Sequence, residues 1–188
     1  MDERISFEKH DGIVKLNRAY KGLCKRLDEI ERMLMGLGAV LQLSGVHQTD
    51  YLFRLPSQLS GEDTRRIKFR LVNGEPFGIY LYDRHSEGSD ITFEFIRPAD
   101  RTLVEALQRS GVPYVCISKI RTRLTFHNLY IHLDQVEGLG DIIEIEAING
   151  ESIPDVVMCA LAPYLVGKLT GSNEDYFQAI EERKEQGC

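Results

Sequence analysis

Apolar and polar residues alternate along the stretch Leu129–Ala147, LYIHLDQVEGLGDIIEIEA, and this pattern predicts a β-hairpin. The linker at 137–140 holds two glycines, which supply the positive φ angles that tight turns use. The alternation brings three carboxylates onto one face of the hairpin: Asp134, Glu144 and Glu146. The solvated face of an edge hairpin would show the same pattern, so the strand that precedes the hairpin has to decide between the two interpretations.

That preceding stretch, Val115–Thr125, reads VCISKIRTRLT and carries Lys119, Arg121 and Arg123 at alternate positions. One alternative is a solvated cationic face with surface ion pairs, each worth about 0 to 1 kcal/mol. However, two neighbouring strands with charge rows of opposite sign, each apolar on its reverse side, favour a polar interior lined by both signs. Such an interior suits a metal ion and a polyphosphate.

The remaining pattern predicts further strands and helices along the chain. Strands are expected at Ile13–Lys21, His47–Phe53, Arg66–Val72, Pro76–Tyr82 and Asp90–Ile96. Amphipathic helices are expected over Leu27–Leu37 and Arg101–Arg109, and the tail 154–188 is expected to be mostly helical with a break around 167–173. Residues 1–11 are expected to be a loose lead-in and residues 55–64 a polar loop.

The order of strand, helix and strands occurs twice, which predicts a single α+β domain. Asn73-Gly74 is a strong hairpin-turn signal between two of the strands. We therefore expect an eight-stranded antiparallel, tunnel-like barrel with flanking helices. A barrel of that size can hold side chains or one small ligand.

Composition limits the class of protein. The 188 residues carry a formal net charge of -6, which argues against partners that need a basic surface, namely nucleic acid and anionic membranes. The four cysteines show no C-x-x-C spacing, and no apolar run is long enough to span a bilayer. We expect a cytoplasmic protein with reduced cysteines, and the sequence leaves its oligomeric state open between a monomer and a homodimer.

Several short motifs together resemble one family. A Lys-x-Arg strand is followed by D-x-V-E-G-L-G at 134–140 and by E-I-E at 144–146. A predicted helix ends in Leu-Gly-Ala at 37–39, and D-Y-F occurs at 175–177. Over residues 13–179 this order resembles the CYTH superfamily, which contains class IV adenylyl cyclases and thiamine triphosphatases and has the triphosphate tunnel fold.

The resemblance implies a set of site residues. The cations that would hold a triphosphate are Lys68, Arg70, Arg84, Lys119, Arg121 and Arg123. Lys21 and Arg121 would act in catalysis. The residues that would hold a divalent metal, Mg²⁺ or Mn²⁺, are Glu94, Asp134, Glu144 and Glu146.

The first strand departs from the family pattern. Where the family has Glu-x-Glu-x-Lys, this chain offers Asn17-x-Ala19-x-Lys21 or, shifted with the same parity, Asp11-x-Ile13-x-Lys15. Both registers present the same face, because side chains alternate with period two. Hard cations need oxygen ligands, so losing two carboxylates would weaken metal binding and favour binding phosphate without turnover.

Three functions follow as expectations. The first is that of a class IV adenylyl cyclase, which converts ATP to cyclic AMP and pyrophosphate. An organic or inorganic triphosphatase would use the same residues with water as the nucleophile. The third is a non-catalytic protein that binds a triphosphate or polyphosphate. In each case the partner is a small-molecule triphosphate, with ATP first.

Overall fold

The computed structural model describes residues 13–54, 64–84, 90–96, 101–147, 152–170 and 173–177. For residues 13–19, 54, 64–65, 82–84 and 90–96 it describes the backbone alone. The predicted lead-in at 1–11 and the core of the predicted loop at 55–64 lie outside the described residues.

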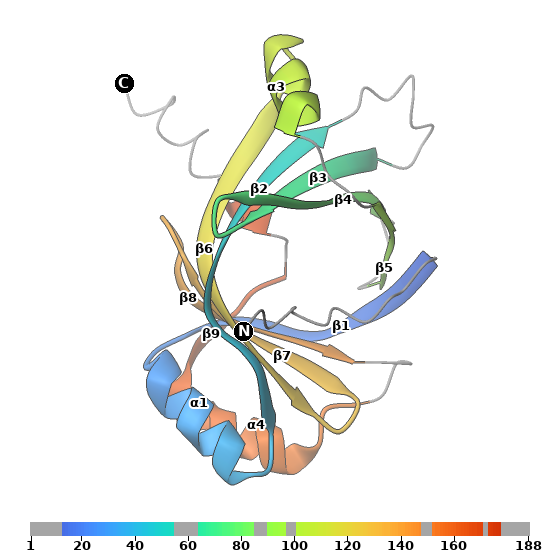
Figure 1. Ribbon diagram of the computed structural model, residues 1–188. Coiled ribbons are helices and arrows are strands. Elements are labelled where there is room, and N and C mark those ends of the chain that lie inside the picture. The colour runs from blue at the N-terminus through green and yellow to red at the C-terminus, as the bar shows by residue number, and fades with distance from the viewer. Residues whose placement is uncertain are drawn as a thin grey trace, which may run out of the picture.

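One antiparallel sheet forms the body of the protein (Figure 1). Its strands are β1 (Ile13–Cys24), β2 (Val40–Arg54), β3 (Thr64–Val72), β4 (Glu75–Arg84), β5 (Asp90–Ile96), β6 (Tyr114–Phe126), β7 (Leu129–Val136), β8 (Gly140–Ala147) and β9 (Leu165–Lys168). They are hydrogen-bonded in the order β5-β4-β3-β2-β6-β7-β8-β1-β9. The hairpin that the sequence predicts is β7 and β8.

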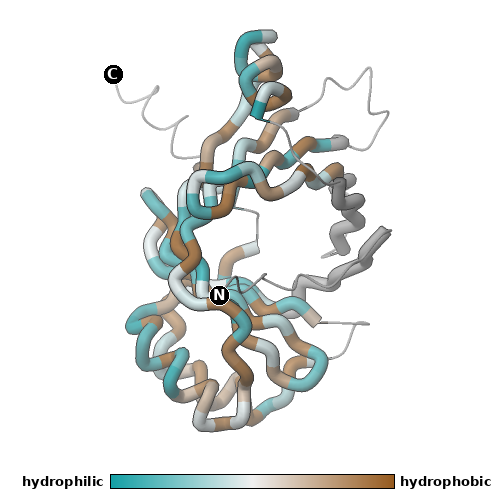
Figure 2. Tube along the Cα trace, viewed as in Figure 1, coloured by the Kyte–Doolittle hydropathy of each residue, from teal (hydrophilic) through white to brown (hydrophobic). Residues whose placement is uncertain are grey.

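The sheet is strongly curled. The first part of β1 also pairs with β5, where Ile13 lies opposite Glu94, so the two ends of the curl are brought together. In Figure 2, polar and apolar positions alternate along the strands, as expected for a sheet with two different faces. The predicted α+β class, with curled antiparallel strands and flanking helices, is confirmed.

The helices α1 (Leu27–Gly36) and α4 (Asp155–Leu161) pack on the outer face of β6, β7 and β8 (Figure 1). In α1, Ile30 and Leu34 are one helical turn apart, and both are fully buried. The helix ends where Gly38 takes a φ of 101°, and the amide of Ala39 then donates to the carbonyl of Leu34. The outer face of β8 supplies Ile143 and Ile145 to this core.

The helix α3 (Arg101–Arg109) closes a second apolar cluster. Its one buried residue, Val104, packs with Phe53, Phe69 and Ile79 from β2, β3 and β4. Together the two clusters occupy the convex side of the sheet. The residues that alternate with them must therefore face the concave side.

The tail differs from its prediction. Residues 165–168, which span the end of an expected helix and the start of its expected break, form β9, which pairs with β1. This pairing is close: a Cβ on Gly22 would lie 2.9 Å from the carbonyl oxygen of Gly167, so only glycine fits at position 22. A 3₁₀ turn at Ala162–Tyr164 separates α4 from β9. None of the helices in the described part of the chain has the length and apolar character that a membrane crossing requires.

The outer core can be tested with two neighbouring positions of α1. We predict that Leu34→Ala lowers the free energy of unfolding by about 2 to 5 kcal/mol, because it removes a fully buried side chain and leaves a cavity. Met35→Ala is the matched control, since Met35 is 46% exposed and its loss is expected to change stability by less than about 0.5 kcal/mol. Urea unfolding measures both. An equal loss of unfolding free energy in the two variants would contradict the packing described here.

Candidate functional site

The register of the hairpin and its neighbours brings opposite charges together on the concave face. On β6 and β7, Arg121 lies opposite Asp134, and Arg123 lies opposite His132. Across the hairpin, His132 lies opposite Glu144. Residues directly opposite one another share a face, so these side chains point into the curl.

A second group comes from β2 and β3. Arg70 on β3 lies opposite Asp50 on β2, and Gln48 on β2 lies opposite Lys119 on β6. The strand β2 therefore separates the cationic rows of β3 and β6. Neighbouring strands are about 4.8 Å apart, so the two rows are about 10 Å apart, within reach of long side chains.

Cationic side chains outnumber carboxylates on this face, by seven to five among the residues whose side chains the structure describes. The cations are Lys21, Arg66, Lys68, Arg70, Lys119, Arg121 and Arg123, and the carboxylates are Asp50, Asp134, Glu144, Glu146 and Glu174. Of these twelve, all but Lys68, Arg123 and Glu146 are buried. The interior of an acidic protein thus holds an excess of positive charge.

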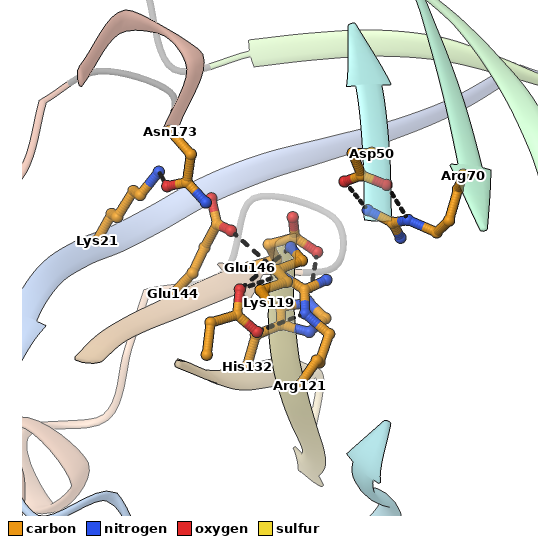
Figure 3. A network of polar contacts seen from close by, with 10 residues as sticks. Lys21, Asp50, Arg70, Lys119, Arg121, His132, Glu144, Glu146 and Asn173 are labelled. Atoms are coloured by element: carbon orange, nitrogen blue, oxygen red, sulfur yellow. Dashed lines mark hydrogen bonds and ion pairs between the residues drawn. The ribbon is translucent and has the colours of Figure 1, made fainter. Parts of the chain in front are cut away.

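Asp50 and Arg70 form a two-pronged ion pair (Figure 3). The Nε and Nη2 atoms of Arg70 donate to the two carboxylate oxygens of Asp50 at 2.6 and 2.7 Å. Burial alone would raise the pKa of Asp50, but the charge and the hydrogen bonds of Arg70 hold it far below its usual range. Asp50 is therefore ionised at neutral pH and neutralises one cation.

Asp134 makes the same kind of contact with β6. Arg121 donates to both of its oxygens, at 2.7 and 2.6 Å, and the Nζ of Lys119 donates to one of them at 3.2 Å. Burial opposes ionisation, yet Arg121 and Lys119 lower the pKa of Asp134 well below its usual value. The Asp134 carboxylate is thus paired with two cations.

The other two hairpin acids have different partners. Glu146 accepts from the Nε2 of His132 at 3.1 Å, and Glu144 lies 3.8 Å from the Nη2 of Arg121 (Figure 3). Burial and the positive charge of Arg121 lower the pKa of His132, so its imidazole is neutral at pH 7. Its Nδ1 is buried and has no hydrogen-bond partner among the described residues.

Lys68 lies on β3, two residues before Arg70 and on the same face. Its Nζ lies 4.4 Å from the centre of the Tyr80 ring, to which Arg70 also approaches, at 5.2 Å. Burial and the neighbouring charge of Arg70 lower the pKa of Lys68 to about 7, and Asp50 offsets this shift only in part. Burial and nearby positive charge thus give the site a lysine whose pKa lies near neutral pH.

Lys119 shows the same effect. Burial and Arg121 lower its pKa, although Asp134 opposes the shift. Near both rows, the Oε1 of Gln48 and the Nε of Arg66 are buried without a hydrogen-bond partner in the described part of the chain. Of these two atoms the Nε of Arg66 is a donor, and an excess of cations with an unsatisfied donor suits a site for an anion.

The structure brings together most of the residues that the sequence predicts for the site. Those found on the concave face are Lys21, Lys68, Arg70, Lys119, Arg121, Arg123, Asp134, Glu144 and Glu146. The side chains of Arg84 on β4 and Glu94 on β5 lie outside the described residues.

Several site residues are absent from the sequence-based prediction. Arg66 extends the row of Lys68 and Arg70, and this period-two pattern could have identified it. Asp50 alternates with Gln48 in a predicted strand, which is a weaker signal. Glu174 reaches Arg66 across 108 residues, and no local pattern predicts such a contact.

The described residues do not fit a divalent metal. Mg²⁺ and Mn²⁺ need oxygen ligands that converge on one point. Both oxygens of Asp134 are taken by Arg121, and Glu146 is paired with His132. Accordingly, the described side chains include no group of three or more His, Cys, Asp or Glu residues arranged for a metal.

A cavity of about 300 Å³ lies elsewhere, on the outer face at one end of β6 and β7. Its lining includes the exposed residues His47, Ile120 and Glu137, together with Asp141. The lining holds two acidic residues and Lys119, whose Nζ is paired with Asp134 on the concave face, so we place the candidate site on the concave face instead.

No protein-family model matches the sequence, and no curated protein matches it either. Among solved structures, a putative adenylate cyclase from Vibrio parahaemolyticus matches with a TM-score of 0.61 and 15% identity, over 88% of this chain and 97% of that one. PH1819 from Pyrococcus horikoshii matches with a TM-score of 0.58 and 21% identity, over 92% and 99%. PH1012 from the same organism matches with a TM-score of 0.56 and 20% identity, over 80% of this chain and 88% of that one.

The chain has their fold. At these identities the likeness concerns the fold alone, and it agrees with the CYTH-like fold that the sequence motifs predict. The matches extend over nearly the full length of each neighbour, so the curled sheet and its helices correspond as a whole.

The electrostatics of Lys68 predict a pH dependence. Its folded-state pKa of about 7 lies below the ordinary value of about 10.4, so between these values the unfolded chain binds more protons than the native protein. Wild-type stability should therefore rise with pH relative to Lys68→Met, which cannot titrate. Urea unfolding from about pH 7 to about pH 9 measures this difference.

Lys25→Met, at an exposed lysine, is the control and should show no such trend. A difference between wild type and Lys68→Met that stays constant or falls with pH would contradict the crowding of cations described here.

Proposed function

We propose that this protein binds a triphosphate on the concave face, through its own cations and without a metal. The observation that carries this proposal is the excess of buried positive charge around Lys68, whose pKa is lowered to about 7 by burial and by Arg70, Lys119 and Arg121. An anion placed among these groups would favour their charged forms and satisfy buried donors. Protonation of Lys68 would accompany binding at neutral pH.

The two cationic rows suit an elongated anion with several negative groups. Lys68 and Arg70 would hold one side of it and Lys119 and Arg121 the other. Asp50 and Asp134 keep the two arginines in fixed positions, so little side-chain entropy is lost when the ligand binds. Inorganic tripolyphosphate and the triphosphate of ATP share this chemistry, and ATP is the nucleotide to test first.

A second candidate is turnover of the bound triphosphate, as a class IV adenylyl cyclase or as a triphosphatase. The observation that favours it is Lys68 itself, because a group with a pKa of about 7 can transfer a proton near neutral pH. The expected dependence on Mg²⁺ or Mn²⁺ stays a prediction. It would require Glu94 or a rearrangement of the paired acids.

Binding can be measured by titration calorimetry with tripolyphosphate and with ATP, in the presence of a chelator. We predict that Lys68→Met weakens the affinity for tripolyphosphate by about ten- to a hundredfold, since it removes a charge-assisted hydrogen bond. Lys25→Met should bind as the wild type does. An equal loss of affinity in Lys68→Met and Lys25→Met, or no binding by the wild type, would overturn the proposal.

The same samples decide between binding and turnover. Incubation with ATP and Mg²⁺ or Mn²⁺, with cyclic AMP, ADP and phosphate resolved, should leave ATP intact if the protein only binds it. Cyclic AMP with pyrophosphate would establish a cyclase, and phosphate release would establish a triphosphatase. An Arg121→Gln variant that still turned over ATP would trace either product to a contaminant.

A further inference from the structure

The C-terminal strap, residues 169–177, joins two distant strands of the curled sheet; residues 171 and 172 of it lie outside the described part. The Nζ of Lys21 on β1 donates to the side-chain oxygen of Asn173. The Nη1 of Arg66 on β3 pairs with the carboxylate of the next residue, Glu174. In the main order of the sheet, β1 and β3 are separated by β2, β6, β7 and β8.

Adjacent residues of the strap thus meet cations from two different parts of the curl. Consecutive Cα atoms are about 3.8 Å apart, so Lys21 and Arg66 are both held at neighbouring points of the strap. Figure 3 shows Asn173 reaching Lys21 beside Glu144, within the same interior as the ion pairs of Arg70 and Arg121. The strap is therefore part of the concave site.

Several contacts fix the strap in this position. The amide of Leu169 donates to the carbonyl of Lys21 at 2.9 Å, and the amide of Thr170 donates to the hydroxyl of Tyr176 at 3.0 Å. The side chains of Leu169 and Phe177 pack against the apolar cluster that includes Val136 and Ile142. Backbone and apolar contacts thus hold the described residues of this segment as a wall of the site.

The pairing of Glu174 has an electrostatic consequence. Its side chain is 0% exposed and that of Arg66 is 7% exposed, so water screens the pair weakly. The Nε of Arg66 remains without a hydrogen-bond partner among the described residues. The carboxylate of Glu174 occupies a place on the guanidinium of Arg66 that phosphate oxygens would otherwise take, because carboxylates and phosphates accept from the same donors.

We propose that Glu174 determines the length of the polyphosphate that the site accepts. This inference rests on the proposed function. Glu174 acts as an internal anion that cancels the charge of Arg66 and confines bound phosphate to the rows of Lys68 and Lys119. Short chains such as tripolyphosphate fit this part of the face, whereas a longer chain meets a buried negative charge.

The test uses the full-length protein and the variant Glu174→Gln, which keeps a hydrogen-bond acceptor for Arg66 and removes the charge. Calorimetry gives the dissociation constants for tripolyphosphate and for a long-chain polyphosphate, in chelator. The wild type should prefer tripolyphosphate, and Glu174→Gln should shift the ratio of the two constants toward the long chain by about tenfold or more. Asp175→Asn, the same change of charge one residue on, should keep the wild-type ratio.

The outcomes separate the two proposals. If the wild type binds tripolyphosphate and Glu174→Gln leaves the ratio unchanged, or if Asp175→Asn shifts it equally, the role of Glu174 is wrong while the proposed function stands. If the wild type binds neither probe, the proposed function fails. Should Glu174→Gln not fold, Arg66→Lys/Glu174→Gln replaces it, because an unpaired buried lysine can lose its proton on folding and regain it when polyphosphate binds, so the same shift toward the long chain is expected.

Discussion

Buried positive charge that is only partly neutralised is the constraint on which the concave face depends. Moving an ion out of water costs several kcal/mol, so each buried cation needs a partner that returns part of that energy. Asp50 and Asp134 do this for Arg70 and Arg121 through paired hydrogen bonds. Lys68 lies near these cations, and burial together with the charge of Arg70 lowers its pKa to about 7.

The fold explains how such a face can exist in a stable protein. The alternation along the strands sends many apolar side chains to the convex side, where they pack with Leu34 of α1 and Val104 of α3. A third apolar cluster, which includes Ile117 and Ile142, lies on the concave face beside the charged groups. These clusters supply the hydrophobic stabilisation, and the remainder of the concave face holds charged groups whose net contribution to stability is small or unfavourable.

Period-two patterning made the fold class and much of the site predictable from the sequence. The rows containing Lys119 and Glu144 were found because their partners are local or lie on a neighbouring strand. The partners of Lys21 and Arg66 in the strap were not predictable, since contacts over more than a hundred residues leave no local pattern. The strand β9 was missed because its pairing depends on a distant residue, Gly22, and because Gly167 within it reads in sequence as a helix break.

The most direct measurement is a crystal structure of the protein with tripolyphosphate bound in the absence of metal. The account predicts phosphate oxygens on the concave face, within hydrogen-bond distance of Lys68 and Lys119, with Glu174 still paired to Arg66. An anion bound instead in the cavity beside His47, or an empty concave face at saturating ligand, would contradict it.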